Sequence, residues 1–479
     1  MRRVAVALVL LALPGMVAAH SFGKLYNLPV PLWLYLYGAA AALLASFLVM
    51  AWFGGQRKPL LSPPARQGPR ESGLGRVPIL LAVRIGQIAS LSLLVLAIVS
   101  GFAGTQNAYL NFNMSGFWIG FVLGFAYLVA LCGDLYARLN PWRLIVAGIE
   151  RVSGPWPVRL PVPSWLGVWP ALLLYMAFIW VELFGETGPS QLSWLLCAYT
   201  LINLAGAWLL GTAIWFRQGE FFAVILRLLA CCAPLYWPNG RLQLRWPFAG
   251  LLSERMQHGS LLLFVLFMLS STAFDGLRET VPWVKLFWQQ LYAPVWVPLL
   301  GDNRVETYSQ LNAIYAIWQT GALLLSPFAY LAAYLLCLKF AQHLTRTPHS
   351  LRTLALAFAP TLIPIALVYH VTHYYTLLFT QGTQLPWLLS DPLGTGSEWA
   401  WRWLGAPPAI IPDAAVVWHT QVGLIVLGHI ASVALAHQVA LQWFATRWQA
   451  TLSQLPMLLL MLLYTGSGLW ILAQPLNAR

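Results

Sequence analysis

Histidine and acidic side chains recur in the second half of this 479-residue chain, within segments that are otherwise strongly apolar. His370 and His373, in the stretch VYHVTHYY, are three residues apart and would share one face of a helix. Asp275 closes another apolar run, in SSTAFDGLRE. His419 and His429 lie ten residues apart in a third run, which corresponds to about 15 Å along a helix. Ionisable groups in such segments are costly and mark functional positions.

Imidazole and carboxylate groups together form the ligand set that proteins use for Zn²⁺ and comparable divalent metals. A metal held by such ligands lowers the pKa of its bound water to about 7 and makes that water a nucleophile. We therefore expect a metal-assisted hydrolytic site, with Asp275, His373 and His429 as its catalytic candidates. The candidate metal ligands are His373, His429, His370, His419, Asp275 and His20.

Each of these residues also has a structural interpretation. A single histidine in a transmembrane helix commonly forms a hydrogen bond to a neighbouring helix. Asp275 would equally serve to cap its helix or to pair with Arg278. His437, eight residues beyond His429, lies deeper toward the other side of the membrane, and we expect it to be structural.

The composition is typical of a protein that crosses a membrane many times. Hydrophobic residues make up 59% of the chain and charged residues only 9%, whereas a soluble domain has about 25% charged residues. The net charge of +13 would suggest nucleic-acid binding, but the basic residues lie mainly in alternate loops, as the positive-inside rule predicts. We therefore expect the lipid bilayer and a hydrophobic small molecule as partners, and no nucleic acid.

Residues 1–19 are typical of a secretory signal peptide. Arg2 and Arg3 precede the short apolar run VAVALVLLAL, and a small-residue cleavage site ends at Ala19. Cleavage there would make His20 the free, periplasmic amino terminus, and an α-amine beside an imidazole favours copper. An uncleaved anchor is the alternative.

Ten apolar runs approach or exceed the 20 or so residues that a helix needs to cross a bilayer. They lie near residues 32–53, 82–104, 115–133, 165–184, 193–215, 259–275, 311–338, 353–379, 416–442 and 455–473. The expected fold is an all-α, polytopic transmembrane helix bundle of about ten spans after a cleaved signal peptide. Residues 20–479 would form its single transmembrane domain.

The connections differ in charge and in character. Those expected in the cytoplasm, which carry the basic residues, lie near 54–81, 134–164, 216–258 and 339–352. The apolar stretch EFFAVILRLLACCAPLYW within 216–258 predicts a helix at the cytoplasmic interface or a re-entrant segment. The connections 276–310 and 380–415, rich in Trp and Pro, predict short periplasmic helices that cap the bundle.

Several long motifs resemble, in order and over nearly the whole mature chain, the bacterial integral-membrane proteins called fenitrothion hydrolases. The motifs are AHSFGKLYNLPVPLWLY, NPWRL, WPALLLYMAFIWVELF, QGEFFAV, STAFDGL, LIPIALVYHVTHYY, LLSDPLGTG and VGLIVLGHIASVALAHQVAL. The resemblance implies a hydrolase of the bacterial inner membrane that cleaves an organophosphorus triester such as fenitrothion and releases a nitrophenol. The ionisable positions matched in it are Asp275, His373, Asp391, His429 and His437, whereas His370 and His419 are additions to the broader pattern.

Two other classes of function remain open. Histidines at several depths along one span, with His20 at its mouth, would suit a transporter or assembly factor that handles a metal such as copper, or haem. The other alternative is a non-catalytic subunit of a membrane complex, bound to a second membrane subunit.

The loop charges predict the orientation of the bundle. Reporter fusions after Arg70, Arg151, Arg245 and His349 should report the cytoplasm, and fusions after Asn107 and Gly394 should report the periplasm, because basic loops stay inside. Cleavage of the 54–81 loop by a protease added outside intact cells would contradict this topology.

Overall fold

The computed structural model describes residues 29–53, 76–237, 242–254, 256–396 and 410–474. The expected signal peptide and His20 lie outside these residues. Within them, nine helices are long and apolar enough to cross a membrane. The chain is therefore an all-α, polytopic membrane protein, as its composition predicts.

The long spans follow the predicted apolar runs closely. They are α2 (Leu32–Phe53), α3 (Arg76–Ala103), the run of α4 (Phe112–Met114), η2 (Ser115–Phe125) and α5 (Ala126–Cys132), α9 (Pro189–Leu210), α12 (Gly259–Arg278), α15 (Arg304–Thr345), the run of α16 (Leu351–Phe358), η8 (Ala359–Leu362) and α17 (Ile363–Thr380), α20 (Ala414–Trp443) and α21 (Arg447–Ala473).

The remaining predicted run, 165–184, forms a shorter helix. This helix, α8 (Trp169–Phe184), has 16 residues, fewer than the 20 or so of a full span. Gly167 takes a positive φ of 46°, a conformation that glycine adopts at little cost, and the helix begins only two residues later. The chain before Trp169 is thus a turn, although it is apolar.

Shorter elements connect the spans. They are α6 (Tyr136–Leu139), α7 (Pro141–Ser153), α10 (Thr212–Ile214), η3 (Trp215–Gly219), α11 (Phe221–Ala230), β1 (Leu235–Tyr236), β2 (Gln243–Leu244), η5 (Ala249–Leu252), α13 (Val281–Lys285), η6 (Leu286–Gln290), η7 (Tyr292–Trp296), α14 (Val297–Leu300), η9 (Gly382–Gln384) and α18 (Leu385–Ser390). The two strands pair as an antiparallel hairpin.

Side-chain caps fix where several helices begin. Asn303, Ser350 and Asp413 accept hydrogen bonds from the first backbone N–H groups of α15, α16 and α20. Thr446 and Gln449 form a capping box at the start of α21. Such caps satisfy N–H groups that have no partner inside the helix, so the polar residue in front of each apolar run sets the start of the span.

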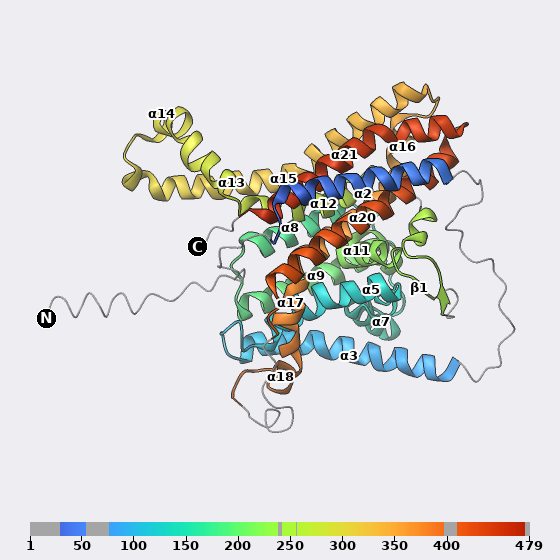
Figure 1. Cartoon of the computed structure of the whole chain (residues 1–479). Helices are drawn as coiled ribbons and strands as arrows, with labels where there is room; N and C mark the ends of the chain where they lie inside the picture. The colour runs from blue at the N-terminus through green and yellow to red at the C-terminus, as the bar shows by residue number, and fades with distance from the viewer. Residues whose placement is uncertain (1–28, 54–75, 238–241, 255, 397–409, 475–479) are drawn as a thin grey trace.

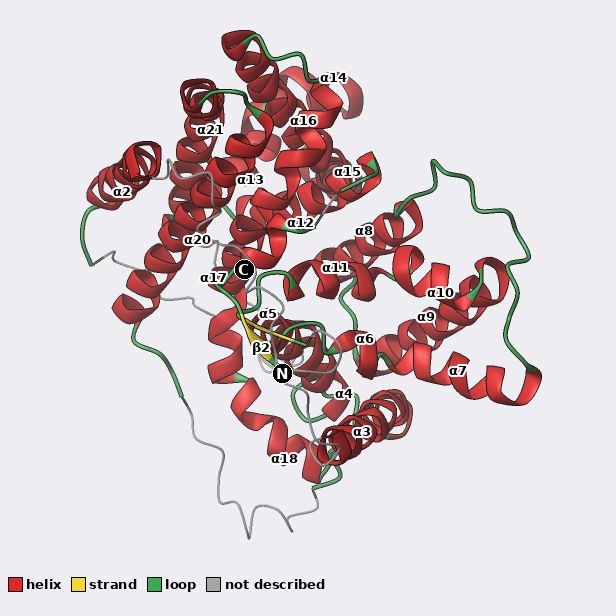
Figure 2. Ribbon diagram, turned by 90° about the vertical axis from the view of Figure 1, so that its right-hand side faces the viewer, coloured by secondary structure: helices red, strands yellow, loops and turns green. Residues whose placement is uncertain are grey.

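Helix α12 is the central helix of the bundle. The apolar part of α12 is 89% buried, whereas those of α2 and α15 are 17% and 22% buried. It packs against α8, α15 and α17, and Figure 2 shows it between these helices. The hairpin of β1 and β2 lies at one end of the bundle, and α13 and α14 project beside α15 at the other (Figure 1). Polar residues on α12 are therefore shielded from lipid.

Helix α11 lies inside the protein and not on its surface. Seven of its ten residues are buried, and it packs against α5 and α8. Of the two alternatives for this apolar stretch, burial favours the re-entrant segment over the interfacial helix.

Glu220 caps α11 and is fully buried. Its carboxylate accepts hydrogen bonds from the backbone N–H groups of Phe222 and Ala223, from Nδ2 of Asn140 at 3.1 Å and from the hydroxyl of Tyr199. Four donors on one carboxylate satisfy this buried group. Asn140 also caps α7, so Glu220 joins α7, α9 and α11.

We expect Glu220→Ala to lower the free energy of unfolding by about 2–4 kcal/mol, because buried donors lose their acceptor and α11 loses its cap. Unfolding by sodium dodecyl sulfate in mixed micelles measures the loss. Glu306→Ala, at an exposed position in the first turn of α15, is the control and should change little. A loss no larger than that of the control would contradict the structural role of Glu220.

Candidate functional site

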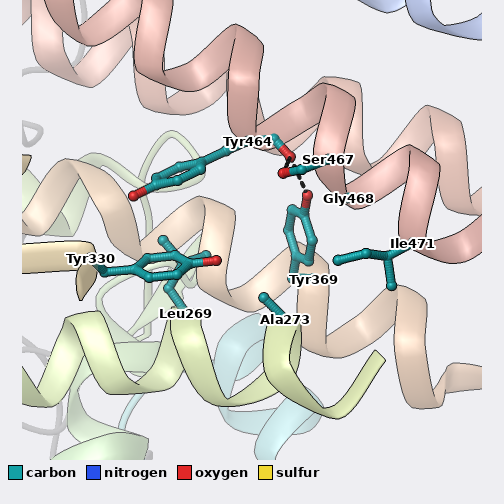
Figure 3. A pocket seen from close by; sticks show the side chains of 8 residues that line it. All are labelled: Leu269, Ala273, Tyr330, Tyr369, Tyr464, Ser467, Gly468 and Ile471. Atoms are coloured by element: carbon teal, nitrogen blue, oxygen red, sulfur yellow. Dashed lines mark hydrogen bonds between the residues drawn. The ribbon is translucent and has the colours of Figure 1, made fainter. Parts of the chain in front are cut away.

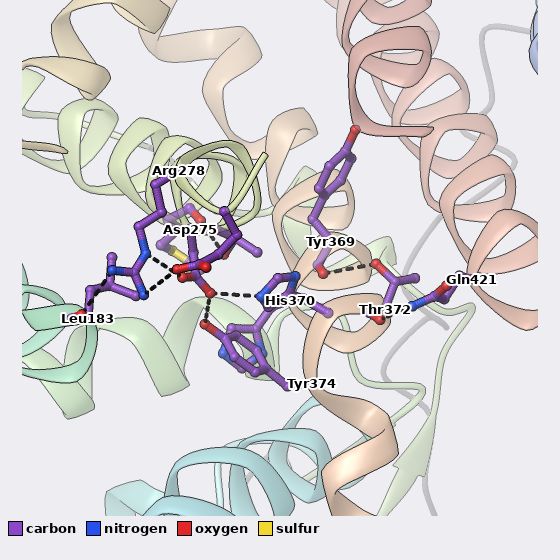
Figure 4. A network of polar contacts seen from close by, with 12 residues as sticks. Leu183, Asp275, Arg278, Tyr369, His370, Thr372, Tyr374 and Gln421 are labelled. Carbon is purple, nitrogen blue, oxygen red and sulfur yellow. Dashed lines mark hydrogen bonds and ion pairs between the residues drawn. The ribbon is translucent and has the colours of Figure 1, made fainter. Parts of the chain in front are cut away.

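Asp275 lies near the end of α12 and is 2% exposed. Its Oδ2 lies 2.7 Å from Nε2 of His373 and accepts a hydrogen bond of 3.0 Å from the hydroxyl of Tyr374. Its Oδ1 accepts a hydrogen bond of 3.1 Å from Nε of Arg278, one turn further along α12. Figure 4 shows this cluster between α12 and α17. Each carboxylate oxygen has a polar partner, as a carboxylate shielded from water requires.

Arg278 connects the cluster to α8. One of its terminal nitrogens donates to the backbone carbonyl of Leu183 at 3.0 Å, and the other lies 3.3 Å from a carboxylate oxygen of Glu279. Its guanidinium carbon lies 5.3 Å from the centre of the Phe184 ring. Arg278 is only 8% exposed, so the ends of α8 and α12 are held together by a buried cation.

Helix α17 supplies His373 and Tyr374 from consecutive positions. Their rings meet edge to face with centroids 4.5 Å apart, so the two side chains approach Asp275 together. The backbone carbonyl of Thr372 accepts a hydrogen bond of 2.9 Å from Gln421 of α20. This bond holds α17 against α20 next to the position of His373.

Glu182 of α8 adds a second carboxylate. It interacts electrostatically with Asp275, His373 and Arg278. With Glu279, which pairs with Arg278, the cluster therefore combines three carboxylates with one permanent cation and one imidazole. Such a set can hold or move a proton, because a proton on His373 would offset the excess negative charge.

Two small neighbouring cavities lie between α12, α17 and α21, and one of them adjoins the cluster. One is lined by His373, Thr272, Gly276 and Tyr369, among others, and offers about 10 Å³ to the centre of a water molecule. The other, with about 20 Å³, extends away from His373 toward Tyr330 and Tyr464, and Figure 3 shows its lining. A water molecule needs about 10–15 Å³ measured in this way, so this space matches single water molecules.

The other candidate histidines lie at different helix interfaces. Nδ1 of His370 lies 3.1 Å from the hydroxyl of Tyr127 on α5. Nδ1 of His419 lies 3.3 Å from the hydroxyl of Tyr35 on α2. The His370 ring also lies 5.0 Å from the ring of Tyr374, so His370 borders the cluster, although its own hydrogen bond is to Tyr127.

Two deeper histidines also have local roles. Nδ1 of His429 lies 2.8 Å from the backbone carbonyl of Ile425, one turn earlier in α20, and His429 is fully buried. Nδ1 of His437 lies 3.0 Å from Nε2 of Gln454 on α21, the interhelical bond expected of a structural residue. The structure thus brings Asp275 and His373 together, and its contacts place His429 elsewhere.

The metal centre expected at Asp275, His373 and His429 stays a prediction. Nowhere among the described residues do three or more His, Cys, Asp or Glu side chains gather in a way that could hold a metal ion. Nε2 of His373 is hydrogen-bonded to Asp275 instead. The copper chelate expected at His20 falls outside the described residues and stays a prediction.

Tyr374 is the member of the cluster that the sequence analysis missed. It directly follows His373 in VYHVTHYY, and a tyrosine in an apolar helix is more often part of a packed core. Arg278 was considered only as an alternative partner for Asp275. The structure gives Asp275 both the arginine and the histidine.

The fold and this cluster define the chain as a polytopic α-helical membrane protein with a buried, charged site near one end of its central helix. In comparison with known proteins, the chain matches no family model, no curated protein and no solved structure. The resemblance to fenitrothion hydrolases therefore stays a prediction from the motifs.

A double-mutant cycle would measure the ion pair in the cluster. Asp275→Ala removes one of the two carboxylates that pair with the buried Arg278 and leaves only Glu279, and we expect a loss of at most about 3–5 kcal/mol in the free energy of unfolding. Arg278→Ala should be similarly costly, whereas the double variant should lose clearly less than the sum of the two. Unfolding in mixed micelles gives all three values, and additive losses would show that the pair is not coupled.

Proposed function

We propose that this membrane protein is a hydrolase that cleaves an organophosphorus triester such as fenitrothion. In this proposal, His373 is the general base and Asp275 is the residue that orients it. The observation that carries the proposal is an imidazole held 2.7 Å from a buried carboxylate, beside a cavity the size of a water molecule. A base oriented by a third group recurs in hydrolases of unrelated folds, and the motif resemblance supplies the substrate class.

In the proposed reaction, a water oxygen attacks phosphorus while His373 takes up the proton of that water. The bond between phosphorus and the aryl oxygen breaks, and the nitrophenolate leaves with the bonding electrons. Asp275 offsets the positive charge that forms on the imidazole. Arg278 and Tyr374 hold Asp275 in place through their own hydrogen bonds.

The substrate is expected to approach from the lipid. An apolar triester dissolves in the bilayer, whereas the cavity beside His373 and its neighbour match water in size. The aryl group must therefore lie outside these cavities.

The proposal places the cluster at the periplasmic side of the bacterial inner membrane. The basic residues Arg143 and Arg151 belong to α7, in a connection expected in the cytoplasm. Asp275 ends a span whose first residue, Gly259, follows another basic connection. With a periplasmic amino terminus and the 16-residue α8 counted as a crossing helix, α12 is the sixth crossing and runs outward, so the site faces a compartment that apolar molecules reach first.

Turnover by purified protein in liposomes tests this function. Wild-type protein should release coloured nitrophenolate from fenitrothion, and His373→Gln should lower kcat by about 10²–10⁴-fold, the usual contribution of a general base. His437→Gln is the matched control, since that histidine bonds Gln454 on another interface. Undiminished turnover by His373→Gln would overturn the role of His373, and inactive wild-type protein would overturn the hydrolase.

One observation favours a second function, the handling of a metal such as copper, or of haem. Nε2 of His429 is buried and has no hydrogen-bond partner among the described residues, and imidazole nitrogens bind copper and haem iron. Elemental analysis and visible absorption of the purified protein would reveal either, and His429→Ala should remove it. If the purified protein shows no turnover and binds no metal or haem, the remaining function is that of a non-catalytic subunit, with a second membrane subunit as its partner.

A further inference from the structure

The two cavities between α12, α17 and α21 are adjacent and are taken together as one feature, in which one cavity reaches His373 and the other does not. Both are lined by Ala273 of α12, Tyr369 of α17, and Gly468 and Ile471 of α21. One ends at His373, and the other extends toward Tyr330 and Tyr464. Because shared residues separate them, a small displacement of one of these side chains joins the two spaces.

Tyr369 is the shared residue with a polar group inside this feature. Its hydroxyl donates a hydrogen bond of 2.7 Å to the backbone carbonyl of Tyr464, and Figure 3 shows the ring lying across the space toward α21. The hydroxyl of Ser467 donates to the same carbonyl at 3.1 Å. These polar groups can bind water molecules in a region that is otherwise apolar.

Gly468 makes this position of Tyr369 possible. A Cβ atom at residue 468 would lie 1.5 Å from the hydroxyl oxygen of Tyr369, far inside any contact distance. Gly466, two residues earlier on the same helix, has nothing within 4 Å of an added Cβ. The position of Tyr369 therefore requires glycine at residue 468 but not at residue 466, and Gly466 is a matched control.

We propose that the two cavities are a water passage to His373 and that Tyr369 controls it as a positioning residue. The passage deepens the proposed function and rests on it, since its role is to supply the water that His373 activates. Its size favours water over any other occupant, because about 20 Å³ and about 10 Å³ hold single water molecules and exclude an aryl ring.

Hydroxyl-radical footprinting of the wild-type protein in liposomes tests for the water directly. Brief X-ray irradiation splits water where it is bound, and the radicals oxidise the nearest aromatic side chains. Tyr369, Tyr330 and Tyr464 should be oxidised several times faster than Tyr175 and Tyr334. The two control tyrosines are buried like Tyr369 but line neither cavity, whereas Tyr330 and Tyr464 are partly exposed. Equal rates for Tyr369 and the controls would overturn the passage.

The variant Gly468→Ala then tests whether Tyr369 regulates the water in the two cavities. The added methyl group displaces Tyr369 and occupies the shared space, so oxidation of Tyr369 should fall to the rate of the controls. Gly466→Ala, with the same change in helix propensity, should leave the rate unchanged. Unchanged oxidation in correctly folded Gly468→Ala protein would show that Tyr369 does not control the water. If Gly468→Ala does not fold, Tyr369→Phe replaces it, because this variant removes only the hydroxyl. The rate at which Tyr330 and Tyr464 are oxidised should then change. An unchanged rate would also show that Tyr369 does not regulate the water.

Because footprinting needs no turnover, the two proposals fail separately. Rapid oxidation of Tyr369 in a protein that hydrolyses nothing would keep the water passage and remove the hydrolase. Active protein with slow oxidation of Tyr369 would keep the hydrolase and remove the passage.

Discussion

A carboxylate among membrane-spanning helices is stable only when the protein supplies the partners that water would otherwise provide. Asp275 meets this constraint with an arginine on its own helix and with an imidazole and a phenol from α17. Each partner is itself fixed, since Arg278 also bonds a carbonyl of α8. The need to satisfy one acidic side chain thus joins three helices at one end of the bundle. Any chemistry at His373 depends on this arrangement, because the imidazole is oriented by Asp275, a buried carboxylate that needs hydrogen-bond partners.

The placement of α12 follows from the same constraint. A helix that carries Asp275 and Arg278 must be surrounded by other helices, and α12 is the most buried of the long spans in the described part of the chain. Glu220 solves the problem differently at α11, where a single carboxylate caps a helix and receives neutral donors without any ion pair. One buried acid is therefore saturated by backbone, amide and phenol donors. The other is linked to a titratable imidazole, and this difference is why the proposed chemistry belongs to Asp275 and not to Glu220.

The spans could be predicted from the sequence because length and hydropathy determine whether a segment crosses a bilayer. The runs that contain Asp275 and His373 both formed helices close to their expected limits. The rotation of each helix about its axis could not be predicted, since hydrophobic residues face both lipid and protein and leave no periodic pattern. For this reason His429 was grouped with His373, although its ring bonds its own helix. Tyr374 was overlooked for the same reason, because only the packing of α17 on α12 reveals which tyrosine meets a carboxylate.

The unequal lengths of the spans have a consequence for the surrounding lipid. Helix α8 has 16 residues and reaches about 24 Å, whereas α15 has 42 residues and reaches about 63 Å. The hydrocarbon layer is about 30 Å thick, so lipids next to α8 face a hydrophobic mismatch that thins the leaflet locally. Leu173 and Trp180 of α8 are exposed to those lipids. The last turn of α8 also holds Arg278 through the carbonyl of Leu183. Bilayer thickness thus acts on the same helix end that anchors the charged cluster, which makes the composition of the membrane a determinant of the geometry around Asp275.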